Sequence, residues 1–303
     1  MTNLSSLDIR GAWSIALGAS VWGLFWYPLR LLDSMGFKGT VAIALVSLLG
    51  ALVAIVVALL RNQGEDLMSF DAWLIGSTMG LSCVLYFLGI MVSDVIRVVF
   101  LFYLLPIWTT IAARILYQEV ITPIQLVFIL LALIGLWLLL GGGTELPLPK
   151  GLGDWCGLAA GITWALCLSM LRGRSDPPPV STTAVTLLCT GLFALIIVVS
   201  IDHPVISGQL PSMNAWYIAV PLGLLFGGLI LFPSMLGQIW GARLVPAPTA
   251  ALLTMTEIIL ATVSAYLIIG TELNSLSMLG GLIIVSVVCV DLVLKHRALA
   301  DNP

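Results

Sequence analysis

Charged side chains are scarce in this sequence. They make up 9% of its 303 residues, against about a quarter in an average soluble domain. Hydrophobic residues make up 60%, and the mean hydropathy is +1.14. A chain so poor in charge cannot cover a water-facing surface, so its expected solvent is lipid. The net charge of −3 is small and spread out, so nucleic acid is not an expected partner.

Histidine and cysteine are also rare. The two histidines, His203 and His296, lie in a loop and near the end of the chain, so a histidine metal site is not expected. The five cysteines fall in apolar segments, and their odd number argues against a disulfide framework. No serine-hydrolase, zinc-protease or P-loop motif occurs. We therefore expect no enzyme activity, no cofactor, no metal and no ATP drive.

Long apolar segments are what the sequence does contain. A hydrocarbon core of about 30 Å needs roughly 20 helical residues, whereas barrel strands would be about 10 residues long and strictly alternating. The sequence therefore predicts an all-α integral membrane protein with ten transmembrane helices. The ten predicted segments are 11–32, 38–60, 70–92, 95–117, 122–142, 153–172, 181–201, 213–235, 246–269 and 275–295.

The lysines and arginines of the loops predict the orientation, because they accumulate on the cytoplasmic side. The side that holds both termini carries eight of them: Arg10, Arg61, Arg114, Arg172, Arg174, Arg243, Lys295 and Arg297. The other side carries four: Arg30, Lys38, Arg97 and Lys150. We therefore expect a multi-pass protein with cytoplasmic N- and C-termini. Its short loops suit the inner membrane of a bacterial cell.

The sequence also repeats itself. Four pairs of identical residues are 142 positions apart, and two more are 143 apart: Gly11/Gly153, Trp13/Trp155, Trp22/Trp164, Arg30/Arg172, Trp73/Trp216 and Gly80/Gly223. These pairs match predicted helices 1 and 3 to helices 6 and 8, so the repeat holds five helices. An odd number of helices makes the second copy enter the membrane from the opposite side. Inverted repeats are typical of transporters, whose substrate site lies between the copies. The alternative is duplication without transport.

Several short motifs resemble the EamA-type permeases of the drug/metabolite transporter superfamily. They are Ala19-Ser20-Val21-Trp22-Gly23, Tyr103-Leu104-Leu105-Pro106 running to Glu119, Gly153-Asp154-Trp155, Gly161-Ile162-Thr163-Trp164-Ala165, Pro246-Ala247-Pro248-Thr249 running to Glu257, and Leu279-Gly280-Gly281-Leu282-Ile283. Two features depart from the family pattern. Ile258, not proline, follows Glu257, and Thr271 holds the place of a glycine before Glu272.

The resemblance implies a carrier of metabolites or amino acids that works by alternating access. It implies one five-helix repeat over 1–145, a second over 146–303, and a central cavity among helices 1, 3, 4, 6, 8 and 9. Its partners would be a small-molecule substrate and membrane lipid, and the carrier would be a monomer or weak homodimer. The Tyr-x-x-Pro run at Tyr103 is similar to that of amino-acid exporters, but Leu105 replaces their tryptophan.

Arg97 and Glu257 are the ionisable candidates for the substrate site. An ionisable group inside a membrane is by default a functional hypothesis. Arg97 either holds a substrate carboxylate or phosphate, or forms an i,i+3 salt bridge with Asp94. Glu257 is the only acidic residue deep in an apolar helix. It would carry a proton, bind an ammonium group, or hydrogen-bond across helices.

Aromatic residues are the candidates for the cavity wall, since they offer apolar area with a polar handle. The candidates are Trp22, Tyr86, Tyr103, Trp108 and Trp164. The alternative is ordinary packing or an interfacial belt.

Prolines and one charged pair are the candidates for gating. Pro106 and Pro221 remove backbone hydrogen bonds inside the membrane, which predicts kinks. Arg114 and Glu119 are expected to form an ion pair at a cytoplasmic gate.

The leading hypothesis is a secondary transporter that exports amino acids or related zwitterions, with Arg97 for the carboxylate and Glu257 for the ammonium group. Carriers of phosphorylated sugars, nucleotide sugars or drugs share the superfamily and are the alternatives. A channel is a further alternative, although channels are usually built by oligomeric symmetry around a polar pore.

Overall fold

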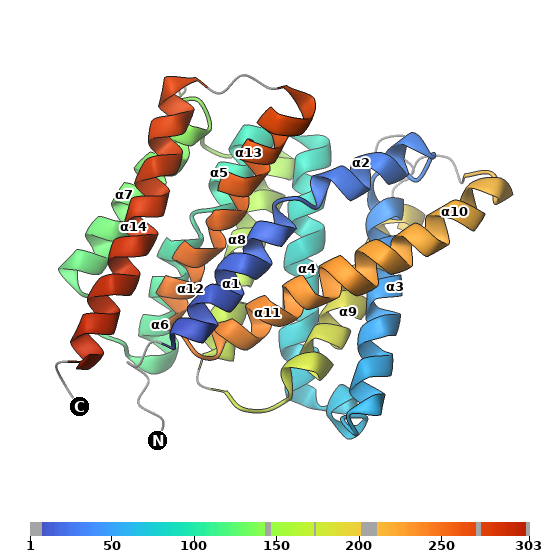
Figure 1. Cartoon of the computed structure of the whole chain (residues 1–303), viewed down its shortest axis with the longest axis horizontal. Coiled ribbons are helices and arrows are strands. Elements are labelled where there is room, and N and C mark those ends of the chain that lie inside the picture. Colours follow the sequence, from blue (N-terminus) through green and yellow to red (C-terminus); the bar gives the residue numbers. More distant parts are fainter. Residues whose placement is uncertain (1–7, 143–146, 173, 201–210, 271–273, 301–303) are drawn as a thin grey trace.

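The computed structural model describes residues 8–142, 147–172, 174–200, 211–270 and 274–300, except for the side chains of 296–300. This described part is helical (Figure 1). Its helices are α1 (Ile9–Trp22), α2 (Trp26–Ser34), α3 (Thr40–Leu60), η1 (Glu65–Met68), α4 (Phe70–Val92), α5 (Val95–Phe102), α6 (Leu105–Tyr117), α7 (Pro123–Leu139), α8 (Leu152–Leu171), α9 (Pro179–Ser200), α10 (Met213–Leu224), η2 (Leu225–Leu231), α11 (Phe232–Ala242), α12 (Ala247–Thr254), α13 (Thr256–Ile269) and α14 (Ser275–Ala300).

The predicted membrane spans are confirmed. Within the described residues, nine helical stretches are long and apolar enough to cross a bilayer. The tenth prediction, 122–142, corresponds to α7, which is apolar but has 17 residues. The predicted boundary between the repeats, at 145 and 146, lies outside the described residues, as do His203, Thr271 and Glu272.

Four of the spans are interrupted. The first breaks between α1 and α2 at Gly23–Phe25, the fourth between α5 and α6, and the ninth between α12 and α13 at Met255. Pro106 is the second residue of α6, where a proline is tolerated because its missing N–H needs no helical partner. In the eighth span Pro221 lies inside α10, and η2 follows it as a seven-residue π-helix. π-helical turns are rare and often lie at functional sites.

The helices pack with internal two-fold symmetry. The first span packs on the eighth through α1 and α11, as the sixth packs on the third through α8 and α4. Three further contacts pair a span with its own counterpart: α3 with α9, α7 with α14, and the fourth span with the ninth through α6 and α12. This is the packing expected of two five-helix copies related by a pseudo-two-fold axis.

Matching polar contacts support the two-fold relation. Ser82 of α4 donates a hydrogen bond to the carbonyl oxygen of Ala160 at 2.7 Å, and Ser234 of α11 donates one to that of Gly18, also at 2.7 Å. Gly18 and Ala160 are 142 positions apart, whereas Ser82 and Ser234 are 152 apart.

Glycines repeat this pattern at one end of the same helix pairs. A Cβ atom on Gly241 would lie 2.5 Å from the Gly11 oxygen, and one on Gly89 would lie 2.8 Å from the Gly153 oxygen. These pairs have the same two offsets, 142 and 152. The predicted equivalence of helices 3 and 8 agrees with these contacts, and the 143-residue offset holds where the two spans begin, at Phe70 and Met213. Because the eighth span has 30 residues against 23 in the third, the offset rises along the pair and reaches 152 at these contacts.

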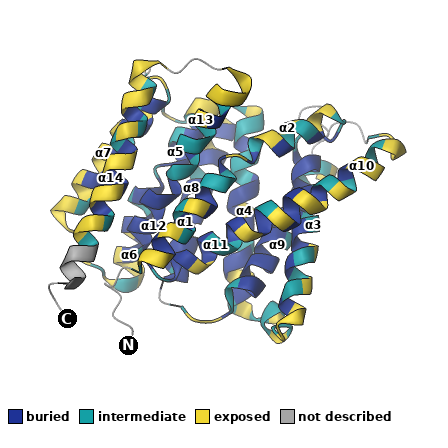
Figure 2. Ribbon diagram, in the orientation of Figure 1, coloured by how far each residue is buried: buried dark blue, intermediate teal, exposed yellow. Residues whose placement is uncertain are grey.

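The two copies run in opposite directions. The start of α1 and the end of α14 lie at the same end of the molecule, whereas α8 enters from the opposite end (Figure 1). Buried residues concentrate where the helices meet, and exposed apolar residues cover the outer faces of α7, α10 and α14 (Figure 2). We call the end that holds the start of α1 the terminal end, and the other the far end.

Candidate functional site

Two adjoining cavities lie between the copies. The larger has a volume of about 380 Å³ and is lined by Trp22, Gly23, Phe25, Trp26, Leu29, Tyr86, Phe87, Ile90, Met91, Val95, Val99, Tyr103, Glu257, Ile258 and Ala261. The smaller holds about 20 Å³, room for about one water molecule. It is lined by Trp22, Ser82, Cys83, Tyr86, Phe102, Trp164, Gln238, Thr254 and Glu257. We call Trp22, Tyr86 and Glu257, which line both cavities, the junction.

The break in the ninth span positions Glu257. The chain interrupts its helix at Met255, so α13 starts just before the glutamate. The hydroxyl of Thr256 then donates to the carbonyl oxygen of Ala16 at 3.1 Å, which ties this break to α1. A Cβ on Gly23 would lie 2.2 Å from the Glu257 carbonyl oxygen. The breaks of the first and ninth spans therefore touch backbone to backbone, and this contact places the backbone of Glu257 beside Gly23, the residue that follows Trp22.

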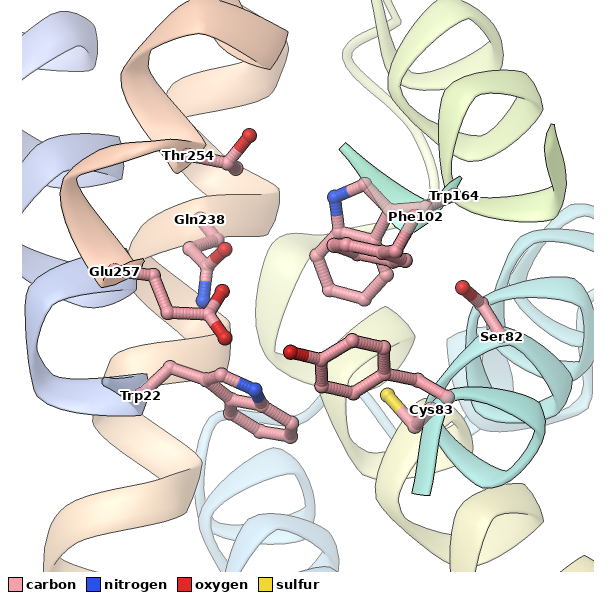
Figure 3. A pocket seen from close by; sticks show the side chains of 9 residues that line it. Trp22, Ser82, Cys83, Phe102, Trp164, Gln238, Thr254 and Glu257 are labelled. Carbon is pink, nitrogen blue, oxygen red and sulfur yellow. The ribbon is translucent and has the colours of Figure 1, made fainter. Parts of the chain in front are cut away.

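Aromatic rings form a continuous chain along the cavities, and Figure 3 labels three of its members, Trp22, Phe102 and Trp164. The ring centroids of Trp22 and Phe87 are 6.1 Å apart, those of Phe87 and Tyr86 6.0 Å, and those of Tyr86 and Phe102 4.6 Å. Trp164 extends the chain, at 6.4 Å from Phe102. These distances are typical of aromatic contacts. The rings come from helices of both copies, so the wall exists only once the copies pack together.

Few polar groups face this wall. The Ser82 hydroxyl donates to Ala160, and the Thr254 hydroxyl donates to the Ala251 carbonyl oxygen at 2.7 Å. Gln238 projects toward Glu257 in Figure 3. The Tyr103 hydroxyl and the indole nitrogen of Trp164 are buried without a hydrogen-bond partner among the described residues. Tyr103 lies beside the Glu257 carboxyl group without completing a hydrogen bond to it. The cavity walls therefore contain hydrogen-bond donors that have no partner among the described residues.

The structure brings five of the seven predicted substrate residues together. Trp22, Tyr86, Tyr103, Trp164 and Glu257 line one or both cavities. The other two do not. The half-buried Trp108 packs against the adjoining core, and its indole nitrogen also has no partner among the described residues.

Arg97 has a different partner from the one the sequence suggested. Its guanidinium pairs with Asp154 of α8, with 2.9 Å between Nη1 and Oδ2. Asp94 instead caps α5, where it accepts from the backbone nitrogen of Arg97 at 2.9 Å. Asp154 is fully buried and also accepts from the Ser93 hydroxyl and the Lys150 backbone nitrogen. The alternative of an Asp94 salt bridge is therefore corrected to an interhelical pair at the far end, outside both cavity walls.

The predicted Arg114–Glu119 ion pair is also corrected. Arg114 donates to the backbone oxygens of Gln118 and Glu119, at 3.3 and 3.2 Å, and so caps the end of α6. The carboxyl group of Glu119 acts on Arg172 instead. Local helix geometry explains the difference, because the last carbonyls of a helix need donors.

Two buried arginines, Arg172 and Arg243, lie at the terminal end. Arg243 donates to the Ser175 carbonyl oxygen at 2.8 Å and to the Thr182 hydroxyl at 3.2 Å, joining the end of α11 to the start of α9. Burial lowers the pKa of Arg243 to about 10, so it stays charged at neutral pH. Burial also lowers the pKa of Arg172. Lys295 near the end of α14 pairs with Asp291 one turn earlier, at 2.8 Å, while the side chains of His296 and Arg297 lie outside the described part.

Sequence reasoning missed the smaller cavity's polar residues. These residues are Ser82, Gln238 and Thr254. Their polarity within apolar helices is the sequence feature that could have identified them. Cys83 and Phe102 gave no signal, because either would serve equally well as core.

Nine membrane-length spans and the shorter apolar helix α7, packed as two opposed copies with cavities between them, have the architecture of a membrane carrier built from inverted repeats. The sequence profile of the EamA-like transporter family matches residues 9–141 and again residues 151–291. The chain therefore belongs to this family, with one copy of its unit in each half.

Other comparisons agree on the fold. A solved structure described only as the crystal structure of a protein has 20% sequence identity and a TM-score of 0.71, covering 94% of this chain and 99% of its own. At this identity the likeness shows the fold alone. A search of curated proteins found no match.

Proposed function

We propose that this transporter exports small metabolites that carry an ammonium group and an apolar body, amino acids and related zwitterions among them. The observation that supports this is the cavity itself, whose wall is apolar except for one charged side chain, Glu257. A carboxylate removed from water is stabilised by a cation placed against it. The aromatic and aliphatic wall would take the apolar body.

The position of Arg97 changes the way a zwitterion would bind. Since its guanidinium pairs with Asp154, a substrate carboxylate needs other donors. The unpartnered indole nitrogen of Trp164 and the amide of Gln238 are the candidates in the smaller cavity. Neither the larger nor the smaller wall contains a described lysine or arginine, which disfavours phosphorylated sugars and nucleotide sugars.

Alternating access would proceed from the arrangement seen here. The larger cavity lies among α2, α5, the end of α4 and the start of α13, all toward the far end (Figure 1). The contacts of Arg243 would hold the terminal end closed. With the termini in the cytoplasm, as the lysines and arginines of the loops predict, the far end would face outward, and this state would release an exported substrate. Rocking of one copy against the other would reverse the access.

Counterflow in proteoliposomes tests the proposal. Vesicles loaded with unlabelled amino acids are offered one labelled amino acid at a time. We expect saturable uptake that Glu257→Gln reduces at least tenfold. The matched control Glu65→Gln changes an exposed glutamate in η1 and should transport normally.

Two results would contradict the proposal. One is unchanged counterflow in folded Glu257→Gln. The other is the absence of counterflow with every amino acid, coupled with saturable uptake of a sugar phosphate.

A further inference from the structure

The junction of the two cavities is richer in aromatic rings than in hydrogen-bond acceptors. We propose that it selects N-alkylated ammonium groups, quaternary ones above all, over primary ammonium groups. This inference rests on the proposed function, because it assigns the chemical class of the substrate's cationic end. The alkylated nitrogen would lie against Glu257 and the faces of Trp22 and Tyr86, and the rest of the substrate would extend into the larger cavity.

The first argument is the number of acceptors. A primary ammonium group has three N–H donors, and each needs an acceptor once water is removed. At the junction the Glu257 carboxyl group is the one acidic acceptor, while the Tyr86 hydroxyl and the nearby Gln238 amide are neutral and weaker acceptors, and the indole nitrogen of Trp22 only donates. An alkylated nitrogen has no such need, so it loses less when it leaves water.

The second argument is the aromatic surface. Trp22 stacks with one face on Phe25, with centroids 5.6 Å apart and planes 19° from parallel. The residue also lines both cavities, so part of its surface borders the space that a ligand would fill. Tyr86 is held between Phe87 and Phe102. A cation over such a ring is attracted by the negative face of the ring, and aromatic cages recognise quaternary ammonium ligands in this way.

The third argument is the packing of the two backbones that carry Glu257 and Trp22. Glu257 begins a helix whose backbone touches Gly23, and Thr256 bonds to α1. The two segments are therefore held together before any ligand arrives. Such preorganisation increases affinity, because less of the chain has to be ordered on binding.

Two matched ligands test the selectivity on the purified full-length protein. Benzyltrimethylammonium and benzylammonium differ only in N-methylation, and isothermal titration calorimetry gives both Kd values. We expect the trimethyl compound to bind at least tenfold tighter. Equal affinity, or tighter binding of benzylammonium, would overturn the inference.

Substitutions locate the effect. Trp22→Leu should weaken benzyltrimethylammonium at least tenfold and benzylammonium by less than threefold, whereas Trp22→Phe should retain most of the preference. Trp155→Leu, at an exposed position on α8, is the matched control and should change neither Kd. Equal losses for both ligands in folded Trp22→Leu would refute the aromatic contribution. If Trp22→Leu fails to fold, the wild-type ligand pair and Trp22→Phe still decide.

The outcome separates this inference from the proposed function. Counterflow of ordinary amino acids that depends on Glu257, combined with no preference for methylated ligands, refutes the inference and leaves the proposed function standing. If neither cation binds and no amino acid is transported, both fail.

Discussion

Breaking the Arg97–Asp154 pair should cost stability. Asp154 is fully buried and accepts from Arg97, Ser93, Lys150 and the Gly151 backbone. Removing one partner of a buried pair costs about 3–5 kcal/mol, because the other charge stays buried. The Arg97 side chain is 24% exposed, so water already weakens the pair. For Arg97→Gln we therefore expect a loss of about 2 kcal/mol in the free energy of unfolding.

The geometry predicts different costs for two changes at position 154. In Asp154→Asn the amide oxygen still accepts from Arg97 and the backbone, and the amide nitrogen can donate to the Ser93 hydroxyl. We expect a loss of about 1–2 kcal/mol, from the weaker uncharged acceptor. Asp154→Ala leaves all these donors without an acceptor, and should cost about 3–5 kcal/mol.

Equilibrium unfolding in mixed micelles, followed by tryptophan fluorescence, measures these values. Arg97→Gln, Asp154→Asn and the double variant form a double-mutant cycle. We expect a coupling energy of about 1–3 kcal/mol, because the two side chains touch. Additive losses, with a coupling energy near zero, would refute the assignment of this pair. The assignment would also be refuted if Asp154→Ala and Asp154→Asn had the same free energy of unfolding.

Three further predictions concern the packing and the site. Ser82→Ala and Ser234→Ala should each lower the free energy of unfolding by about 1 kcal/mol, since both remove two-fold-related hydrogen bonds. The control is Ser286→Ala, which loses only a hydrogen bond within its own exposed helix turn. Clearly unequal losses for the first two variants in an unfolding assay would contradict the symmetry. Gly89→Val and Gly241→Val should each lower the free energy of unfolding by more than about 2 kcal/mol through backbone clashes. Gly151→Ala should be tolerated, because the space around its Cβ position is open. Equal melting temperatures for all three variants would refute the close contacts. Gly23→Ala should lower the initial rate of counterflow at least tenfold, because its Cβ would displace the Glu257 backbone. An unchanged rate would show that this contact does not set the carboxylate position.

The sequence was sufficient for the helices and for the opposed copies, because both depend on local patterns. Apolar length predicts a span wherever it occurs, and the offset of 142 between Trp22 and Trp164 reflects the two-fold relation directly. The 143-residue offset of Gly80 and Gly223 does not extend along the whole of helices 3 and 8, because the longer eighth span includes a seven-residue π-helix. The hydrogen bonds of Ser82 and Ser234 and the close contacts of Gly89 and Gly241 show an offset of 152 further along.

The ion pairs were less accessible to sequence reasoning. Asp94 lies one helical turn from Arg97, so a local argument selects it, whereas Asp154 becomes the partner only when α8 packs on α5. The breaks at Gly23–Phe25 and Met255 lack a proline at the break itself and have no strong local signal. The π-helix is a partial exception. The α-helical pattern is weakened there by Pro221, Gly227, Gly228 and Pro233. These residues do not by themselves specify the wider turn of a π-helix.

The late position of Glu257 in the chain has a consequence for biosynthesis. Charged residues raise the cost of inserting a helix by about 2.5–3.5 kcal/mol when they lie at its centre. The ninth span has a mean hydropathy of 2.0 and can bear this cost. By the time α13 leaves the ribosome, Trp22, Tyr86, Tyr103 and Trp164 are already in the bilayer. The aromatic residues of the cavity wall are thus inserted before the carboxyl group of Glu257. The cavity gains its acidic side chain only when this second-to-last span is inserted.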